Sequence, residues 1–150
     1  ISNTIKEFQG VEHRLEHVKF INNVEFVNDS KATNIQSVKV AIDSYNKPII
    51  LILGGYNKGA DFRLLLPHIK ASNVRDIVSY GDAGGQINTA LGDAVSSVQV
   101  TDLNSAVKKA HSLATPGDIV LLSPGCASFD QFPNFEVRGN FYKSVVRNEL

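Results

Sequence analysis

Short apolar runs and segments with helical apolar spacing take turns along the chain. Residues 49–53 (IILIL) and 119–122 (IVLL) are continuously apolar, and residues 76–80 (DIVSY) and 98–100 (VQV) are short, mainly apolar segments that we also predict as strands. Such runs are typical of strands that are buried on both faces of a sheet. Between them, apolar residues recur three and four positions apart, which predicts helices over residues 35–45, 62–70, 84–91, 103–114 and 135–148.

This alternation predicts an α/β fold, in which a mostly parallel sheet is covered by helices on both faces. With right-handed crossovers the arrangement is a doubly wound, Rossmann-like domain. No low-complexity segment or Pro/Gly-rich linker divides the sequence. With 150 residues, the chain has the size of one ordinary domain and is long enough to bury a core.

Two short extended runs, residues 14–20 and 24–28, precede the alternation. The Asn pair at 22–23 between them favours a tight turn, so we expect an N-terminal antiparallel β-hairpin. Residues 1–8 have the pattern of the last part of a helix, with Gly10 as its stop.

Polar or glycine-rich loops leave the carboxyl ends of four predicted strands. They are NDSKATN (28–34), GGYNKGADF (54–62), YGDAGGQ (80–86) and SPGCASFDQF (123–132). In an open parallel sheet these ends meet at one edge, where the binding crevice forms. We therefore expect a ligand site where these loops gather.

The loop at residues 28–34 has two interpretations. Its acid, amide and hydroxyl side chains suit the cap of a first helical turn, and Thr33 or Asn34 would be that cap. Lys31 favours an anion site as well, because a cap needs no ammonium group whereas a helix N-terminus attracts anions. The two roles are compatible.

Lys58 and Ser128 stand in two further loops of the same edge. With Lys31 and Thr33 they would bring two cations and two hydroxyls together, which suits a dicarboxylate or an acyl phosphate. The plainer alternative is that Lys58 is only solvated, and that Ser128 and Asp130 cap the helix that follows.

Composition excludes several classes of protein. Fifteen basic residues balance fifteen acidic ones, so nothing suggests a nucleic-acid partner. The longest apolar run is far too short to span a bilayer, and no signal peptide is visible. One cysteine excludes a disulfide framework and fits a reducing compartment. We expect a cytoplasmic protein, without membrane contact, that is a monomer.

Cysteine and histidine suggest no further chemistry. Cys126 has no histidine near it in sequence, so a small buried residue is a more natural interpretation than a nucleophile. His13 and His17 have the spacing of a helical metal site but fall in a predicted strand. We expect no metal site from the histidines.

Four segments together resemble a known family. EHRLEHV (12–18), NDSKATN (28–34), GGYNKGADF (54–62) and LLSPGCASFDQFPNFEVRGNFY (121–142) look like the C-terminal domain of the Mur ligases. The pair of NDSKATN with the last segment is specific for the member that adds D-glutamate in peptidoglycan synthesis. The resemblance extends over residues 10–142 in the right order.

The resemblance implies an enzyme of three domains, of which this chain matches the third. ATP would phosphorylate the carboxylate of UDP-N-acetylmuramoyl-L-alanine, and the amine of D-glutamate would attack the acyl phosphate. Residues 10–150 would position D-glutamate and close over ATP, and residues 1–9 would be the tail of the connection from a central ATPase domain. ATP and Mg²⁺ would be the cofactors, with the Mg²⁺ ligands mostly in that central domain. The isolated domain would be inactive.

The resemblance also implies roles for single residues. Lys31 would lie near the reacting phosphate and glutamate as the catalytic group. The residues that would hold D-glutamate are Thr33, Lys58, Ser128, Phe129 through its backbone, and Phe135. Those that would reach the nucleotide are Arg14 and Asp29, with His13 beside them.

Composition and topology alone leave two rival functions open. One is a non-enzymatic Rossmann-like module that binds a small anionic metabolite, which would not need Lys31, Lys58, Ser128 and FDQFPNFEVRG together. The other is a dinucleotide-binding domain. It is disfavoured because GxGxxG and an acidic residue at the end of a second strand are both missing.

Overall fold

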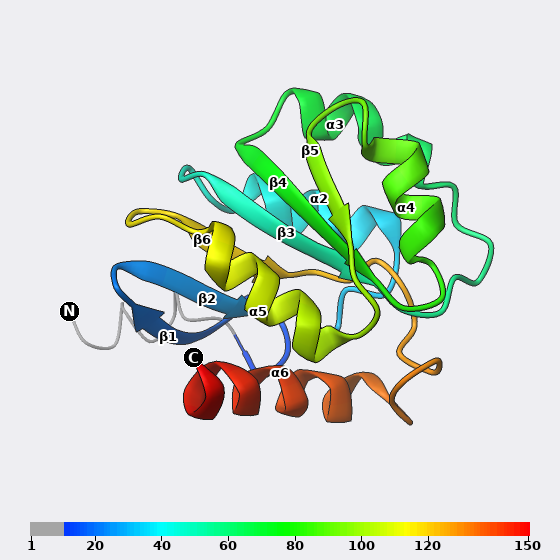
Figure 1. Ribbon diagram of the computed structural model, residues 1–150. Coiled ribbons are helices and arrows are strands. Elements are labelled where there is room, and N and C mark those ends of the chain that lie inside the picture. The colour runs from blue at the N-terminus through cyan, green and yellow to red at the C-terminus, as the bar shows by residue number, and fades with distance from the viewer. Residues whose placement is uncertain (1–10) are drawn as a thin grey trace.

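The computed structural model describes residues 11–150, which contain a six-stranded mixed sheet of order β1-β2-β6-β3-β4-β5 (Figure 1). The strands are β1 (Glu16–Ile21), β2 (Val24–Asn28), β3 (Ile49–Gly54), β4 (Val74–Tyr80), β5 (Ser96–Gln99) and β6 (Ile119–Leu122). β1 runs antiparallel to β2, and all other neighbouring strands are parallel. The expected α/β class with an N-terminal hairpin is confirmed.

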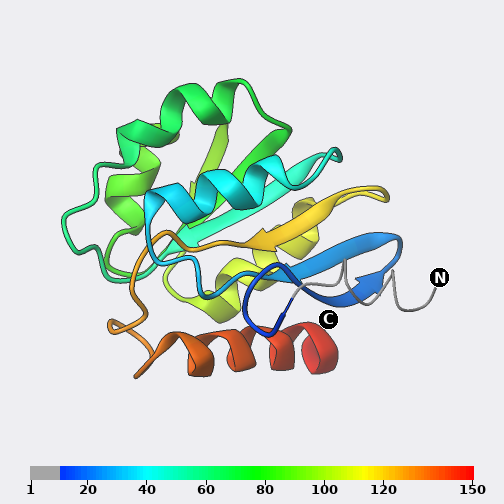
Figure 2. The same ribbon diagram turned by 180° about the vertical axis from the view of Figure 1, so that it is seen from behind.

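Helices cover both faces of this sheet. They are α2 (Ile35–Asp43), the 3₁₀ helix η1 (Phe62–Leu65), α3 (Leu66–Lys70), α4 (Gly84–Leu91), α5 (Leu103–Leu113) and α6 (Phe135–Glu149). α5 and α6 lie in front of the sheet in Figure 1, whereas α2, α3 and α4 lie in front in Figure 2. The chain thus forms a doubly wound sandwich.

Two hydrophobic clusters result from the alternation of side chains along the strands. Leu51 and Leu53 pack toward α2, η1, α3 and α4, whereas Ile50 and Ile52 pack toward α5 and α6. All four side chains are fully buried. This explains why β3 shows no polar interruption in the sequence, since neither of its faces meets water.

Most predicted elements agree with the structure to within a few residues. Asn22 and Asn23 have φ angles of 50° and 62°, as the type I′ turn of a two-residue hairpin requires. The helix predicted at residues 62–70 is divided into η1 and α3, and Pro67, which has no N–H to donate to a preceding turn, stands at the start of α3. The predicted helix at residues 1–8 and its stop at Gly10 lie outside the described residues.

Candidate functional site

The polar loops do gather at the carboxyl edge of the sheet, and backbone hydrogen bonds join them. These bonds run from Gly125 N to Ala32 O (2.8 Å), from Tyr56 N to Ala127 O (2.8 Å) and from Ala83 N to Gly55 O (2.9 Å). Loops that share backbone bonds hold one another in place. The edge is therefore a fixed surface on which side chains from distant parts of the sequence keep defined positions.

A pocket of about 270 Å³ opens at this edge beside the loop of residues 28–34. Its lining comes from Arg14, Leu15, Asp29, Lys31, Ala32, Ser37, Val40 and Ala41. Two cations thus converge on a hollow that also contains a carboxylate. Arg14, Asp29 and Lys31, which the resemblance connected with nucleotide and phosphate, are the charged members of this lining.

Asp29 is the buried acid of the pocket, with a relative exposure of 4%. Its Oδ1 accepts a hydrogen bond from Leu15 N (3.1 Å), and its Oδ2 accepts one from the hydroxyl of Ser123 (2.8 Å). Burial raises the pKa of Asp29 from 3.8 to about 6, although these hydrogen bonds and the charge of Arg14 act in the opposite direction. The carboxylate is oriented and partly desolvated before any ligand arrives.

The loop of residues 28–34 caps helix α2 and also places the charged side chain of Lys31 at the pocket. Asn34 caps α2, since its Oδ1 accepts a hydrogen bond from Ser37 N (2.9 Å). Of the two proposed caps, Asn34 is thus confirmed, and Thr33 is exposed. Ser30 and Ala32 are buried while Lys31 between them is exposed. Lys31 therefore projects from the loop and lines the pocket.

His13 lies in a turn before β1, one residue before the extended run predicted at 14–20, whereas His17 lies in β1. It is 4% exposed, and its Nδ1 lies 2.9 Å from the side-chain amide of Asn28. Its ring meets that of Phe135 edge-on, at 6.0 Å between centroids. Its carbonyl accepts a hydrogen bond from Lys31 N (2.9 Å). His13 is thus a buried residue that supports the neighbouring Arg14 and Lys31.

The residues expected to hold D-glutamate occupy neighbouring loops, and none of them lines the pocket at Arg14 and Lys31. Lys58 is exposed, and its Nζ lies 5.2 Å from the ring centroid of Phe129, which is 60% exposed. This cation–π contact orients the ammonium group of a long, mobile side chain. Ser128 is buried at the start of the turn that contains Phe129.

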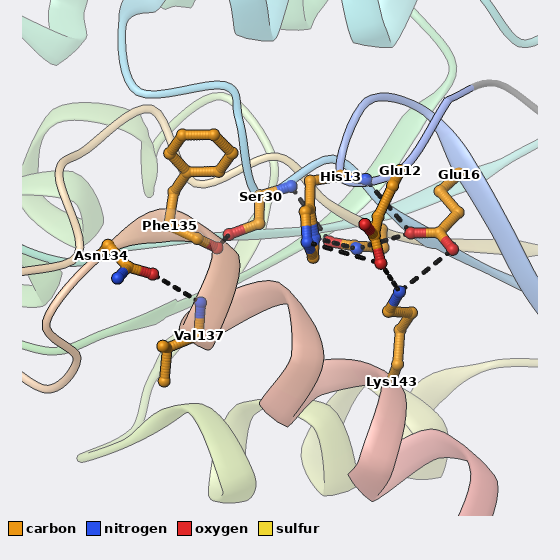
Figure 3. A network of polar contacts seen from close by, with 9 residues as sticks. Glu12, His13, Glu16, Ser30, Asn134, Phe135, Val137 and Lys143 are labelled. Atoms are coloured by element: carbon orange, nitrogen blue, oxygen red, sulfur yellow. Dashed lines mark hydrogen bonds and ion pairs between the residues drawn. The ribbon is translucent and has the colours of Figure 1, made fainter.

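For the loop at 123–132, the sequence predicted a buried Cys126 and a helix cap at Ser128 or Asp130; the structure confirms only the first. Cys126 is buried, and burial raises the pKa of its thiol to about 12, so it carries no thiolate at neutral pH. The expectation that it is a small buried residue is confirmed. Capping of the last helix by Ser128 or Asp130 is wrong, because α6 begins later and is capped by Asn134, whose Oδ1 accepts from Val137 N (2.8 Å; Figure 3).

Arg138 is the central residue that sequence reasoning missed. It is fully buried, and its guanidinium group donates to the Ser30 hydroxyl (2.9 Å), the Ser30 carbonyl (2.8 Å) and the Cys126 carbonyl (2.9 Å). The Ser30 hydroxyl in turn donates to the carbonyl of Phe135 (2.7 Å). The available signal was that position 138 lies in the apolar register of the helix predicted at 135–148.

The charged and apolar side chains of residues 11–150 form neither a metal site nor a membrane-spanning helix. No group of three or more His, Cys, Asp or Glu side chains there is arranged to hold a metal ion. No helix in this part of the chain has the length and apolar character needed to cross a membrane.

Known proteins and one protein family are similar to this chain in sequence. Residues 13–126 match the family described as "Mur ligase, glutamate ligase domain". Proteins named UDP-N-acetylmuramoylalanine–D-glutamate ligase are similar to the chain. The one from Natranaerobius thermophilus is 46% identical over 97% of this chain and 32% of its own length. The one from Chlamydia caviae is 44% identical over 95% of this chain and 34% of its own. The chain spans about a third of the length of these relatives.

Solved structures share the fold at low sequence identity. A bifunctional folylpolyglutamate synthase/dihydrofolate synthase from Yersinia pestis superposes with a TM-score of 0.66 at 16% identity, over 94% of this chain and 32% of that one. A murein peptide ligase from Psychrobacter arcticus gives 0.62 at 13% identity, over 99% of this chain and 32% of that one. At these identities the likeness concerns the fold alone.

Proposed function

Because the chain belongs to the Mur ligase family through its glutamate ligase domain, we propose that it serves an ATP-dependent ligase that joins D-glutamate to UDP-N-acetylmuramoyl-L-alanine in cell-wall synthesis. The most similar relatives reported above have the name of that enzyme. The observation that carries the proposal is the convergence of Arg14, Asp29 and Lys31 on one pocket at the carboxyl edge of the sheet.

The pocket would take part of the nucleotide. Arg14 and Lys31 offer cationic donors to phosphate oxygens. Each oxygen of Asp29 accepts one hydrogen bond within the protein and keeps a lone pair that can accept from a ribose hydroxyl. A volume of about 270 Å³ is small for a whole ligand of this size, so the rest of the nucleotide would contact other parts of the ligase.

D-glutamate would bind across the neighbouring loops. Lys58, held over the Phe129 ring, would pair with a carboxylate of the substrate. The hydroxyls of Thr33 and Ser128 and the backbone of Phe129 would supply further hydrogen bonds, and Phe135 would pack against the substrate. When the amine attacks the acyl carbon and phosphate leaves, a nearby Lys31 would stabilise the anionic intermediate.

ATP and Mg²⁺ are the cofactors of the proposed reaction. A bifunctional folylpolyglutamate synthase/dihydrofolate synthase with this fold has been solved with Mn, AMPPNP and L-glutamate bound. Mg²⁺ would neutralise charge on the transferring phosphate when bound. No group of three or more His, Cys, Asp or Glu side chains in residues 11–150 is arranged to hold a metal ion, so we propose that the Mg²⁺ ligands lie mostly outside these residues. That the chain by itself is inactive, cytoplasmic and monomeric stays a prediction.

A titration of this chain with D-glutamate, followed by backbone amide NMR, tests the proposal. We expect shifts at Lys31, Thr33, Lys58, Ser128 and Phe135 that are selective over L-glutamate and are lost in Lys58→Ala. Lys109→Ala, which removes an exposed lysine from α5, is the matched control and should leave the titration unchanged. Equal responses to both isomers and to other dicarboxylates would instead support a non-enzymatic module for anionic metabolites.

A further inference from the structure

The turn that carries Arg14 is held from the far side by α6. Lys143 of α6 is 7% exposed, and its Nζ donates to Glu12 Oε2 (3.0 Å) and to Glu16 Oε2 (3.2 Å). Figure 3 shows its ammonium group between these two carboxylates, below His13. The other oxygen of Glu16 accepts from His13 N (3.1 Å) and from the side-chain amide of Asn28 (3.0 Å). One ammonium group thus fixes two acids that flank the turn.

The turn needs such support because its backbone conformation is unfavourable. His13 and Leu15 have φ angles of 65° and 47°, a region that residues with a Cβ seldom occupy. Such a conformation is strained and persists only where surrounding contacts impose it. Glu12 and Glu16 lie immediately before and after the strained residues, so their attachment to α6 imposes the turn from both ends.

This conformation also places the charged groups of the pocket. Arg14 lies between the two strained residues and lines the pocket. The carbonyl of His13 accepts from Lys31 N (2.9 Å), and Leu15 N donates to Asp29 Oδ1 (3.1 Å). A change in the backbone of the turn would therefore displace Arg14 and remove one support each from Lys31 and Asp29.

We propose that Lys143 is a positioning residue for this pocket, which it orders through Glu12 and Glu16 without lining it. Only the identity of the ligand, a nucleotide phosphate, rests on the proposed function. The ordering of the turn does not. Lys143 therefore influences the pocket through the backbone of the turn, although it does not line the pocket itself.

Amide hydrogen exchange in the 150-residue chain tests this ordering without a ligand. Lys143→Met keeps much of the aliphatic stem and removes the ammonium group. We expect exchange at the amides of Leu15 and Lys31 to become at least about tenfold faster, and the Cα and Cβ shifts that report positive φ at His13 and Leu15 to be lost. Lys143→Arg should restore both. Lys108→Met removes a different ion pair, which joins α5 to α6 (Lys108 Nζ to Glu149 Oε1, 3.1 Å). It should change neither the exchange rates nor the Cα and Cβ shifts.

A parallel titration with AMPPNP separates this inference from the proposed function. The wild-type chain should show shifts at Arg14, Asp29 and Lys31, and Lys143→Met should weaken the affinity about tenfold. No response in the wild type would contradict the nucleotide site, while the exchange data would still decide the role of Lys143. Exchange in Lys143→Met that matches Lys108→Met would overturn the inference. If Lys143→Met does not fold, Glu12→Gln decides, since Glu12 is 66% exposed and its loss removes one arm of the contact.

Discussion

Asp29 is a carboxylate that the fold buries at the rim of a pocket. Its neighbours Leu15 and Ser123 donate to both of its oxygens, yet burial raises its pKa from 3.8 to about 6. A residue that served stability alone would not be expected to keep a desolvated charge without an ion pair. The cost is understandable if the oriented carboxylate receives a ligand.

The pKa of Asp29 predicts how stability depends on pH. Between about pH 4 and pH 6 the folded chain retains a proton that the unfolded chain has released, so this residue lowers the free energy of unfolding as the pH rises. The full effect is on the order of 3 kcal/mol. Asp29→Asn lacks this titration and should gain stability relative to the wild type from about pH 4 to pH 7 in urea unfolding. Parallel profiles for the two proteins would refute the shift.

At the scale of elements, α6 is the helix that holds the site together. Its N-terminal carbonyl at Phe135 accepts from Ser30, its Arg138 reaches the loops, and its Lys143 holds the turn at His13. Gly139 lets the helix approach that turn, since a Cβ there would overlap Nδ1 of His13 and lie 2.7 Å from its Cε1. The glycine is thus required by packing and not by backbone conformation.

Two glycine substitutions in helices should have effects of opposite sign. Gly139→Ala gains about 1 kcal/mol of helix propensity but forces His13 to move, so we expect a net loss of about 2 kcal/mol. In Gly85→Ala on α4 the nearest contact is Gln99 Nε2 at 3.8 Å, so propensity decides and stability should rise by about 0.5 kcal/mol. Urea midpoints measure both, and stabilisation by Gly139→Ala would show that His13 yields without cost.

At the scale of the whole molecule, Arg138 joins parts of the chain that are far apart in sequence. Its three hydrogen bonds connect α6 to Ser30 after β2 and to Cys126 after β6. These partners are neutral, so the buried guanidinium group acts as a multiple donor for carbonyls that would otherwise be unpaired. At the carboxyl edge, the loops after β2 and β6 are therefore joined by the hydrogen bonds of one polar side chain.

Arg138→Met should loosen the loops after β2 and β6 together. Two buried carbonyls lose their donor, an effect that relief from burying a charge offsets in part, and we expect a net loss on the order of 2 kcal/mol. Arg147→Met, which changes an exposed arginine of the same helix, should stay within about 0.5 kcal/mol. Chemical denaturation gives both values. Amide shifts confined to only one of the two loops in Arg138→Met would contradict the bridging role.

Elements that depend on local interactions were predicted from the sequence, whereas contacts between distant residues were not. α4 and β6 were predicted with their observed bounds, because glycine turns and apolar periodicity are local signals. Asp29 and Lys31 were assigned to a site by resemblance, and the structure brings them to one pocket. Arg138 was overlooked, since an arginine between Val137 and Gly139 gives no local sign of which distant carbonyls it will contact.

Local sequence patterns alone specify the succession of strands and helices along the chain, the burial of the sheet on both faces and the edge at which the polar loops gather. These follow from hydrophobic periodicity and from the direction of parallel strands, which neighbouring residues encode. The positive φ angles of His13 and Leu15, and the ion pairs by which Lys143 holds their turn, arise only in the folded chain. Such features depend on contacts between residues more than a hundred positions apart, whose energies no local pattern contains.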